Sequence, residues 1–512
     1  MQFDLSKRPL GHCLSRQLFF EEKDALGKGW DKGLYLALSV ESTSMFASTV
    51  SRPSGFIRLI PTADGAEQSY TLGCENMLAV ARCGDAGSLS VAADGEKAMH
   101  LSATGLGLTV KVRLGSGESM IQTERGFEVI MGADRYVIQP LVGTGRMEVM
   151  WNLNALRSSD PVLYFEPVDG KLELLFWDTD VRYILPAAAE SAEASAAKTM
   201  AEFSEFCSKL PEGADAALAY DLWIGIQRRR GQALVAESRI TSQQSSAISQ
   251  SVAVLALKDT SEKLKLLSGL FRLETAAGLI PSCIKESSIL PEAAAPIFGV
   301  ALRTADYASV DTALLESFYD GFTKAADWWF NQRYCEKGCF YAYAHECGFP
   351  MQLAVPAPRP CVSPDLLTYL IIDCEEIIRM AAVLGKNASL WKLRADALLS
   401  SLLCLIDGET VRSRDALSGE FFKTPAALEC VPLLLAEKLP AATADALFKK
   451  AAALDACNSD YFLLGLLGLS CAPLAEKVKS LGAELSSVAS AANYSPARSS
   501  MLLALNERSL TE

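Results

Sequence analysis

The spacing of hydrophobic residues changes once along this 512-residue chain, and the change divides it into two parts. In segments such as 34–41 and 106–114, apolar and polar residues alternate, which places them on opposite faces of β-strands. Beyond about residue 200 the apolar residues instead recur at three- and four-residue steps, the period of α-helices. We therefore expect a β domain over 1–186, a linker over 187–199 and an all-α domain over 200–512.

Two β-hairpins are predicted in the first part. Segments 127–130 and 136–141 flank a Gly-Ala-Asp turn, and segments 162–165 and 171–177 flank Asp169-Gly170. Turn residues between two short apolar runs favour a hairpin. Several short strands with such turns, and no convincing helix among them, predict an antiparallel β-sandwich.

The expected linker, 187–199, is rich in alanine, so it favours a helix with little to bury. About a dozen helices can be placed after it, the number in a double-layered (α/α)6 toroid. An α-solenoid would also give many helices, but the sequence shows no fixed-period repeat.

Composition excludes several classes of partner. The chain has 61 acidic against 48 basic residues, and a net charge of −13 opposes binding to nucleic acid or to an anionic membrane surface. No apolar run approaches the roughly 18 residues of a membrane helix, and the N-terminus lacks a signal peptide. The 14 cysteines are scattered singly rather than spaced like a disulfide scaffold. These features predict a cytoplasmic protein.

The stretch from Glu316 to Gly385 predicts a helix, a long loop and a second helix. Asp311 is a suitable N-cap for the first helix. Ser363-Pro364-Asp365 opens the second helix with a capping hydroxyl, a proline at the first helical position and a carboxylate near the positive end of the dipole, and Gly385 ends it. The aromatic loop between them, 335–361, is long enough to indicate a functional segment.

The order of motifs here resembles that of the six-hairpin glycosidases. An Asp-Trp-Trp helix end at 327–329 precedes Glu346-Cys347-Gly348-Phe349-Pro350, and a Pro-Asp-Leu helix follows that ends in Ala-Val-Leu-Gly. Within these enzymes the chain looks most like the clan of trehalases, processing α-glucosidases and mannosylglycerate hydrolases. Fainter similarities at 270–284, 296–302 and 494–505 extend the resemblance over about residues 210–512.

The resemblance implies an inverting hydrolase with two carboxyl groups, which such enzymes hold about 6.5–9.5 Å apart. The general acid of the clan falls on Pro350, which has no proton to donate, and the second acid falls in 488–494, which contains none. The nearest substitute for the general acid is Glu346, either as a catalyst or ligand contact or as a structural hydrogen-bond acceptor. Asp365 fits a helix N-terminal residue better than a catalyst.

Aromatic and polar residues elsewhere in the chain are further candidates for ligand contacts, and each also has a structural explanation. Aromatic residues are more often core than sugar platforms, and the polar run at 237–247 is more simply the start of a helix. The candidate substrate-binding residues are Tyr341, Tyr343, His345, Phe349, Asp365, Glu237, Arg239 and Gln243. The spacing of Cys335, Cys339, His345, Cys347 and Cys361 matches no zinc knuckle, so neither a metal nor another cofactor is expected.

Two functions therefore stay open. The first is a divergent glycoside hydrolase, trehalase-like in fold, that acts on a small α-linked glucoside or mannoside. The second is a pseudoenzyme that keeps the toroid as a carbohydrate-binding or interaction protein. Both take a small saccharide as partner, and neither excludes a homo-oligomer. Fold alone does not choose between them.

Overall fold

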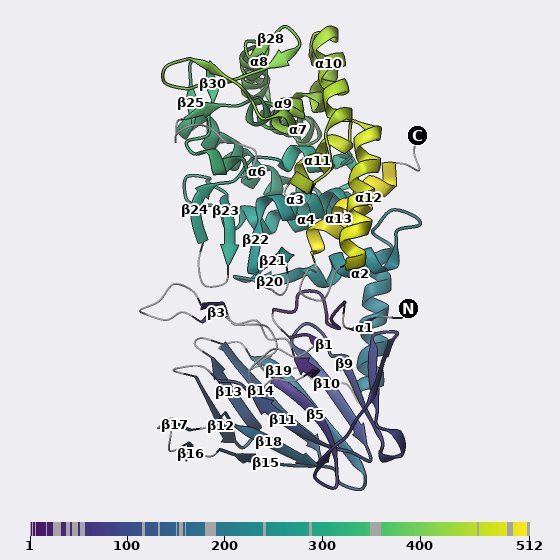
Figure 1. Cartoon of the computed structure of the whole chain (residues 1–512). Coiled ribbons are helices and arrows are strands. Elements are labelled where there is room, and N and C mark those ends of the chain that lie inside the picture. Colours follow the sequence, from purple (N-terminus) through teal and green to yellow (C-terminus); the bar gives the residue numbers. More distant parts are fainter. Residues whose placement is uncertain are drawn as a thin grey trace.

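The computed structural model describes the chain except residues 1, 3, 6, 17, 24–31, 37–40, 43–49, 52–56, 115–117, 132–133, 150, 153–156, 159, 180–190, 239–241, 286–288, 349–359, 458–459, 489–494 and 509–512. Strands dominate up to Thr179 and helices dominate from Ala192. Figure 1 shows the N-terminal strands as a two-sheet body below the helical body. No helix among the described residues is long and apolar enough to cross a membrane.

Two antiparallel sheets form the N-terminal β-sandwich, as predicted. One has the order β12 (Ser119–Thr123), β13 (Gly126–Met131), β14 (Asp134–Val142), β19 (Lys171–Thr179), β10 (Ala98–Thr104), β9 (Ser88–Ala93), β8 (Leu78–Arg82) and β7 (Thr71–Glu75). The other has the order β1 (Phe20–Lys23), β2 (Gly33–Leu36), β5 (Ile57–Ala63), β11 (Gly107–Val112), β18 (Val162–Glu166) and β15 (Thr144–Glu148), with β6 (Ala66–Glu67) beside β5. Their apolar faces share one core.

One predicted hairpin is confirmed and the other is wrong. β13 pairs with β14, so that Phe127 lies opposite Ile138. β18 and β19, by contrast, lie in different sheets: β18 pairs with β11 and β15, while β19 pairs with β14 and β10. The Asp-Gly turn reverses the chain but does not decide which sheet receives the next strand, and here the chain crosses from one layer to the other.

The described part of the predicted linker belongs to α1 (Ala192–Cys207). Ser191 caps this helix by accepting a hydrogen bond from the N–H of Ala194 at 3.2 Å. The expectation that the segment buries little is wrong, since Ala192, Ala196 and Thr199 within it are buried. Small side chains let the helix approach β9 closely, and the Thr199 hydroxyl donates to the carbonyl of Ala93 at 2.9 Å.

The helical body is an (α/α)6 toroid. Its inner ring consists of α3 (Ala247–Leu255), α5 (Phe298–Leu302), α7 (Pro364–Leu384), α9 (Ala426–Cys430), α11 (Tyr461–Gly468) and α13 (Pro496–Arg508). Each inner helix packs on the next, and α13 returns to α3, which closes the ring. The outer layer consists of α2 (Ala216–Gly225), α4 (Thr260–Phe271), α6 (Thr312–Gln332), α8 (Ser389–Leu403), α10 (Ala441–Ala453) and α12 (Ala472–Val488).

Because an outer helix returns the chain before each inner helix, the inner helices run in the same direction. Their N-terminal ends therefore share one end of the ring, which we call the mouth. The segments that precede inner helices gather there, including a sheet of β20 (Ile226–Arg229), β21 (Gln232–Ser238), β22 (Ser242–Ser246), β23 (Pro281–Lys285) and β24 (Ile289–Ala293). The long loop between α6 and α7 lies at the same end.

The predicted helix ends around this loop agree largely with the structure. The Asp311 carboxylate caps α6 by accepting from the N–H groups of Ala313 at 3.0 Å and Leu314 at 3.1 Å. Gly385 ends α7 in the left-handed conformation with φ of 65°. The three- and four-residue period of apolar residues understates the burial of α7. An inner helix is covered on nearly all sides, and even Asp365, Asp373 and Glu376 are buried.

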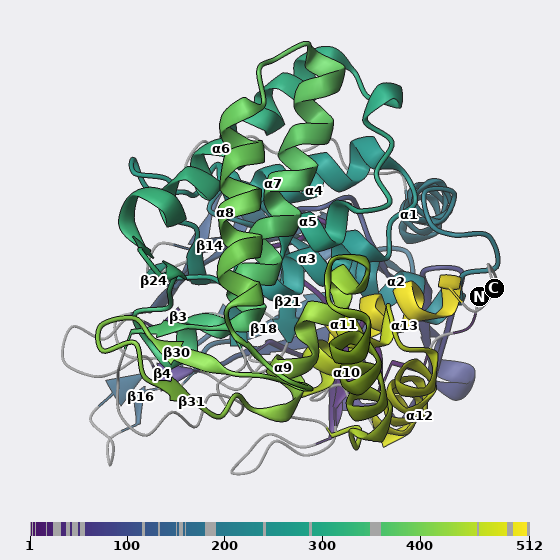
Figure 2. The same ribbon diagram turned by 90° about the horizontal axis from the view of Figure 1, so that it is seen from above.

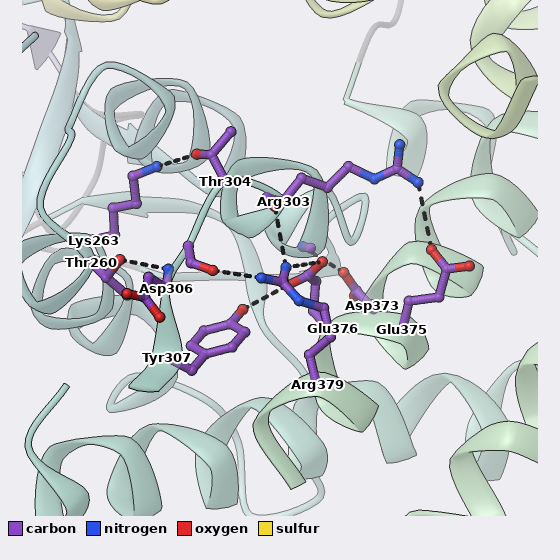
Figure 3. Close-up of polar contacts among 12 residues, drawn as sticks. Thr260, Lys263, Arg303, Thr304, Asp306, Tyr307, Asp373, Glu375, Glu376 and Arg379 are labelled. Carbon is purple, nitrogen blue, oxygen red and sulfur yellow. Dashed lines mark hydrogen bonds and ion pairs between the residues drawn. The ribbon is translucent and has the colours of Figure 1, made fainter. Parts of the chain in front are cut away.

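Glycine permits an unusually close approach between α5 and α7. The N–H of Gly299 donates to the Asp373 carboxylate at 2.7 Å. One turn further along α7, Glu376 accepts from the Tyr307 hydroxyl and from Arg379, each at 2.7 Å (Figure 3). Burial raises the pKa of both carboxyl groups above the ordinary range. These contacts join α7 to α5 and to the short helix η2 (Tyr307–Ser309).

The two bodies are joined by the segment before β1. Its Arg8 donates to the Asp221 carboxylate on α2 at 2.8 Å, and the same carboxylate accepts from the Ser499 hydroxyl on α13 at 2.8 Å. Burial raises the pKa of Asp221, and the Arg8 guanidinium partly offsets this rise. Further along, Arg16 pairs with Asp178 at the end of β19. The segment thus ties the sandwich to the point where the ring closes.

Gly299→Ala should destabilise the protein by about 1–3 kcal/mol, the usual cost of overpacking a core. An added Cβ would lie 2.6 Å from Asp373 Oδ1 and 2.8 Å from the Asp373 nitrogen, so the two helices would have to separate. Chemical denaturation measures the effect. Gly73→Ala is the control, since an added Cβ there meets nothing within 4 Å. Equal stability of the two variants would contradict this account.

Candidate functional site

The candidate site lies at the mouth, where the α6–α7 loop meets segments distant in the sequence. His345 Nε2 lies 3.2 Å from Glu292 Oε2 on β24. On the other side of the loop, a Cβ added to Gly348 would lie 2.3 Å from the Ile248 side chain at the start of α3. The loop therefore sits between two of the inner hairpins.

The short helix η3 (Ala344–Cys347) shapes the loop, and the Glu346 carboxylate holds η3 in place. Oε2 accepts from the N–H groups of Ala342 at 2.6 Å and Tyr343 at 3.3 Å. Oε1 accepts from the Arg333 guanidinium at 3.3 Å, and that guanidinium lies 5.1 Å from the centre of the Trp328 ring. Only 1% of Glu346 is exposed, so two backbone N–H groups and the Arg333 guanidinium surround a carboxylate with almost no access to solvent.

The catalytic role expected of Glu346 finds no support in this geometry. A general acid must reach the leaving oxygen of the substrate, but both oxygens of Glu346 face their own loop. Its two oxygens accept from the N–H groups of Ala342 and Tyr343 and from Arg333, so neither is directed at a substrate. The geometry favours the other role considered, that of a structural hydrogen-bond acceptor.

Tyr343 and His345 are the expected ligand residues that the structure brings together at the surface. Their rings stack in parallel, with centroids 5.5 Å apart and an interplanar angle of 8°. Half of Tyr343 is exposed, and the contact with Glu292 orients the imidazole of His345. The pair therefore offers a fixed flat surface with polar groups at its edge.

Tyr341 and Asp365 must be removed from the set of expected ligand contacts. Both are completely buried, and the Tyr341 hydroxyl donates to Asp365 Oδ2 at 2.9 Å. The ring of Tyr341 packs edge-on against Trp329. The predicted capping role of Ser363 is also wrong, because its hydroxyl bonds to the Asp365 carboxylate and not to a backbone N–H. Burial raises the pKa of Asp365 from 3.8 to about 6.

Glu237 lies on β21 and accepts a hydrogen bond from Gln244 Nε2 at 2.6 Å. This contact orders the sheet at the mouth but does not bring Glu237 to the Tyr343 pair. Gln243 lies on β22, but its side chain falls outside the described part, as do Arg239 and Phe349. Pro350, where the resemblance places the general acid of the clan, and residues 489–494 also lie outside it.

Sequence reasoning missed Glu292 and Arg333. Glu292 is 53 residues from its partner His345, and no spacing rule connects the two segments. Arg333 follows the predicted α6, where a cation near the end of a helix has an ordinary explanation. A clearer signal was the three-residue spacing of Tyr343 and Glu346, since Glu346 accepts from the Tyr343 N–H as the acid of a capping box does.

The cysteines of the loop are not arranged around a common centre. Within the described residues, no group of three or more His, Cys, Asp or Glu side chains is placed to hold a metal ion. Cys339, Cys347 and Cys361 are buried. Burial raises the pKa of the Cys361 thiol to about 12, which disfavours the thiolate that a metal would require.

Comparison with solved structures agrees with the fold. A family GH92 α-mannosidase from Bacteroides thetaiotaomicron, solved with mannoimidazole, is similar over 98% of this chain and 82% of its own, with a TM-score of 0.55 and 10% identity. A GH63 mannosylglycerate hydrolase from Thermus thermophilus, solved with glucose, matches over 57% of this chain and 99% of its own, with a TM-score of 0.46 and 13% identity.

No protein-family model matches the chain, and no curated protein matches it by sequence. The similarity to the solved α-mannosidase confirms the expected resemblance to six-hairpin glycosidases at the level of fold.

Glu346→Gln should lower the free energy of unfolding by about 1–3 kcal/mol, because the amide loses the charge and turns a donor toward groups that also donate. Proteolysis should also cut more readily within the loop. Chemical denaturation and limited proteolysis test this. Glu292→Gln, at a partly exposed position, should stay within about 0.5 kcal/mol of the wild type. Equal effects of both substitutions would argue against a structural role for Glu346.

Asp365 should make stability depend on pH. Folded Asp365 keeps its proton up to about pH 6, whereas in the unfolded chain it is released near pH 3.8. The folded state binds more protons in this window, so the contribution of Asp365 to the free energy of unfolding falls as pH rises. From about pH 4 to about pH 7, Asp365→Asn should gain about 2.5 kcal/mol relative to the wild type.

The measurement is urea unfolding of both proteins across this pH range. The asparagine still accepts from Tyr341 but has no charge to desolvate. A difference in stability that does not change with pH would rule out the buried carboxyl as its source.

Proposed function

We propose that the protein binds a small α-linked mannoside or glucoside at the mouth of its helical ring, with one sugar ring against Tyr343. The observation that carries this proposal is the parallel stack of Tyr343 on His345, half exposed on a loop that Glu346 holds in shape. The apolar face of a pyranose packs on such a ring, while its hydroxyls reach groups at the edge.

The sugar class rests on the fold together with this surface. The α-mannosidase with a similar architecture along nearly the whole chain was solved with mannoimidazole. At 10% identity this likeness concerns the fold, so the ligand is inferred from the aromatic pair and its polar neighbours. His345 and Glu292 supply a hydrogen-bonding edge beside the Tyr343 ring.

Binding without hydrolysis is the activity that these residues support best. Proline replaces the general acid at position 350, the segment 488–494 has no acid, and Glu346 is committed to its own loop. The scaffold then serves as a carbohydrate-binding protein.

Hydrolysis is the second candidate, and one observation favours it. Glu292 is a partly exposed carboxylate beside the Tyr343 and His345 pair, so a substrate on that pair would lie near an acid. In this version Glu292 takes the part first assigned to Glu346, and Glu292→Gln should abolish turnover while binding persists.

Tyr343→Ala should weaken sugar binding at least tenfold, about 1.4 kcal/mol, because the sugar loses its stacking surface. Isothermal titration and thermal shift with mannosylglycerate, glucosylglycerate, kojibiose, nigerose and trehalose provide the measurement. Tyr334→Ala is the control, since Tyr334 is similarly exposed but packs on Phe330.

The same samples are assayed for released monosaccharide. Binding of none of these sugars, or binding unaffected by Tyr343→Ala, would refute the proposed site. Release of sugar by the wild type that Glu292→Gln removes would replace the binding proposal with the hydrolytic one.

A further inference from the structure

The outer helix α8 presents an apolar face to solvent. Leu393 and Leu390 have 68% and 55% of their surface exposed, and Ala397, Ser400 and Cys404 continue the same face at helical spacing. The opposite face packs through Trp391, Leu398 and Leu402. Exposed leucines at consecutive turns are unusual on a monomer and mark a contact surface.

This surface is concentrated on one helix. Large apolar side chains exposed on the described helices are Val383 on α7, Leu390, Leu393 and Leu403 on α8, and Phe448 on α10. Figure 1 places α8 at the end of the helical body far from the β-sandwich, and Figure 2 shows it from above. A partner could therefore approach α8 without meeting the sandwich.

Two charged residues flank the apolar face along one side. Lys392 and Asp396 are both exposed and lie one turn apart. In a pair of antiparallel helices related by a twofold axis, this side of one helix faces the same side of the other. If the twofold axis crosses the helix pair at the height of Ala395, Lys392 of each copy comes within reach of Asp396 in the other. The two residues then differ by only about 3 Å in height along the helix axis.

The apolar residues agree with the same arrangement. Around this axis Leu393 lies opposite Ala397 of the second helix, and Leu390 lies opposite Ser400. Large side chains thus meet small ones, as close packing requires. In a parallel pair this side of one helix faces the opposite side of the other, so Lys392 and Asp396 of the two copies would not meet.

We propose that two copies of this chain form a dimer through antiparallel α8 helices, with Lys392 of each copy paired to Asp396 of the other. The interface is isologous, since the same surface serves both copies. It lies on the outer layer, so it is independent of the sugar site at the mouth.

Analytical ultracentrifugation of the full chain from about 1 to 100 µM tests the proposal, a range in which modest interfaces dissociate. The wild type should be a dimer at the upper end. Leu393→Glu should be a monomer throughout, whereas the control Phe448→Glu on α10 should dimerise like the wild type. A monomeric wild type, or a dimer that survives Leu393→Glu, would overturn the proposal.

Charge exchange tests the orientation. Lys392→Asp should weaken the dimer at least tenfold, because it places two carboxylates together on each side of the axis. Combining it with Asp396→Lys should restore the wild-type affinity. No effect of the single change, or no recovery in the double variant, would exclude the antiparallel pairing. Circular dichroism checks that each variant is folded.

Discussion

The buried carboxyl groups of α7 are the constraint on which the helical body depends. Asp373 is buried and accepts a hydrogen bond from the N–H of Gly299. This contact requires a residue without a side chain at that position of α5. A polar group buried without a partner costs a protein stability, so each carboxyl must be matched by donors. Asp365 is matched by the Tyr341 hydroxyl from the mouth, and Glu376 by the Tyr307 hydroxyl at the other end. One helix thereby binds directionally to three different segments, which fixes its rotation as well as its position.

The same principle acts in the loop at the mouth, with a different result. Glu346 holds its loop by bonds to that loop's own backbone, and this leaves the neighbouring Tyr343 and His345 free to face solvent. An ordered loop loses less conformational entropy when it binds a ligand. The residue that looked most like a catalyst is therefore best understood as the support of the exposed Tyr343 and His345 pair.

The sequence predicts those features that depend on neighbouring residues. The change of period separates sheet from helix, and the Asp311 cap and the Gly385 stop require only a few adjacent positions. It does not predict features that depend on segments meeting in space. The turn at Asp169 looks the same whether β19 joins the sheet of β18 or the opposite sheet.

At the site, the sequence predicts that both tyrosines of the aromatic loop contact the ligand. In the structure Tyr341 points inward to Asp365, while Tyr343 points outward. Their positions in the chain are only two apart. Which of them meets solvent is decided by the packing of α7 and by Trp329, and neither is visible from local pattern. The contact of Glu292 with His345 likewise follows only from the arrangement of the ring.

The meeting of Arg8, Asp221 and Ser499 bears on how this protein is made. These residues come from the segment before the sandwich, from the first outer helix and from the last inner helix. During synthesis on the ribosome, α2 emerges nearly 300 residues before α13, and until then Asp221 lacks one of its partners. The apolar faces that α13 covers on α2 and α3 stay open for the same interval. The growing chain therefore carries an unclosed ring through most of its translation, and it is in this period that chaperones would be needed most.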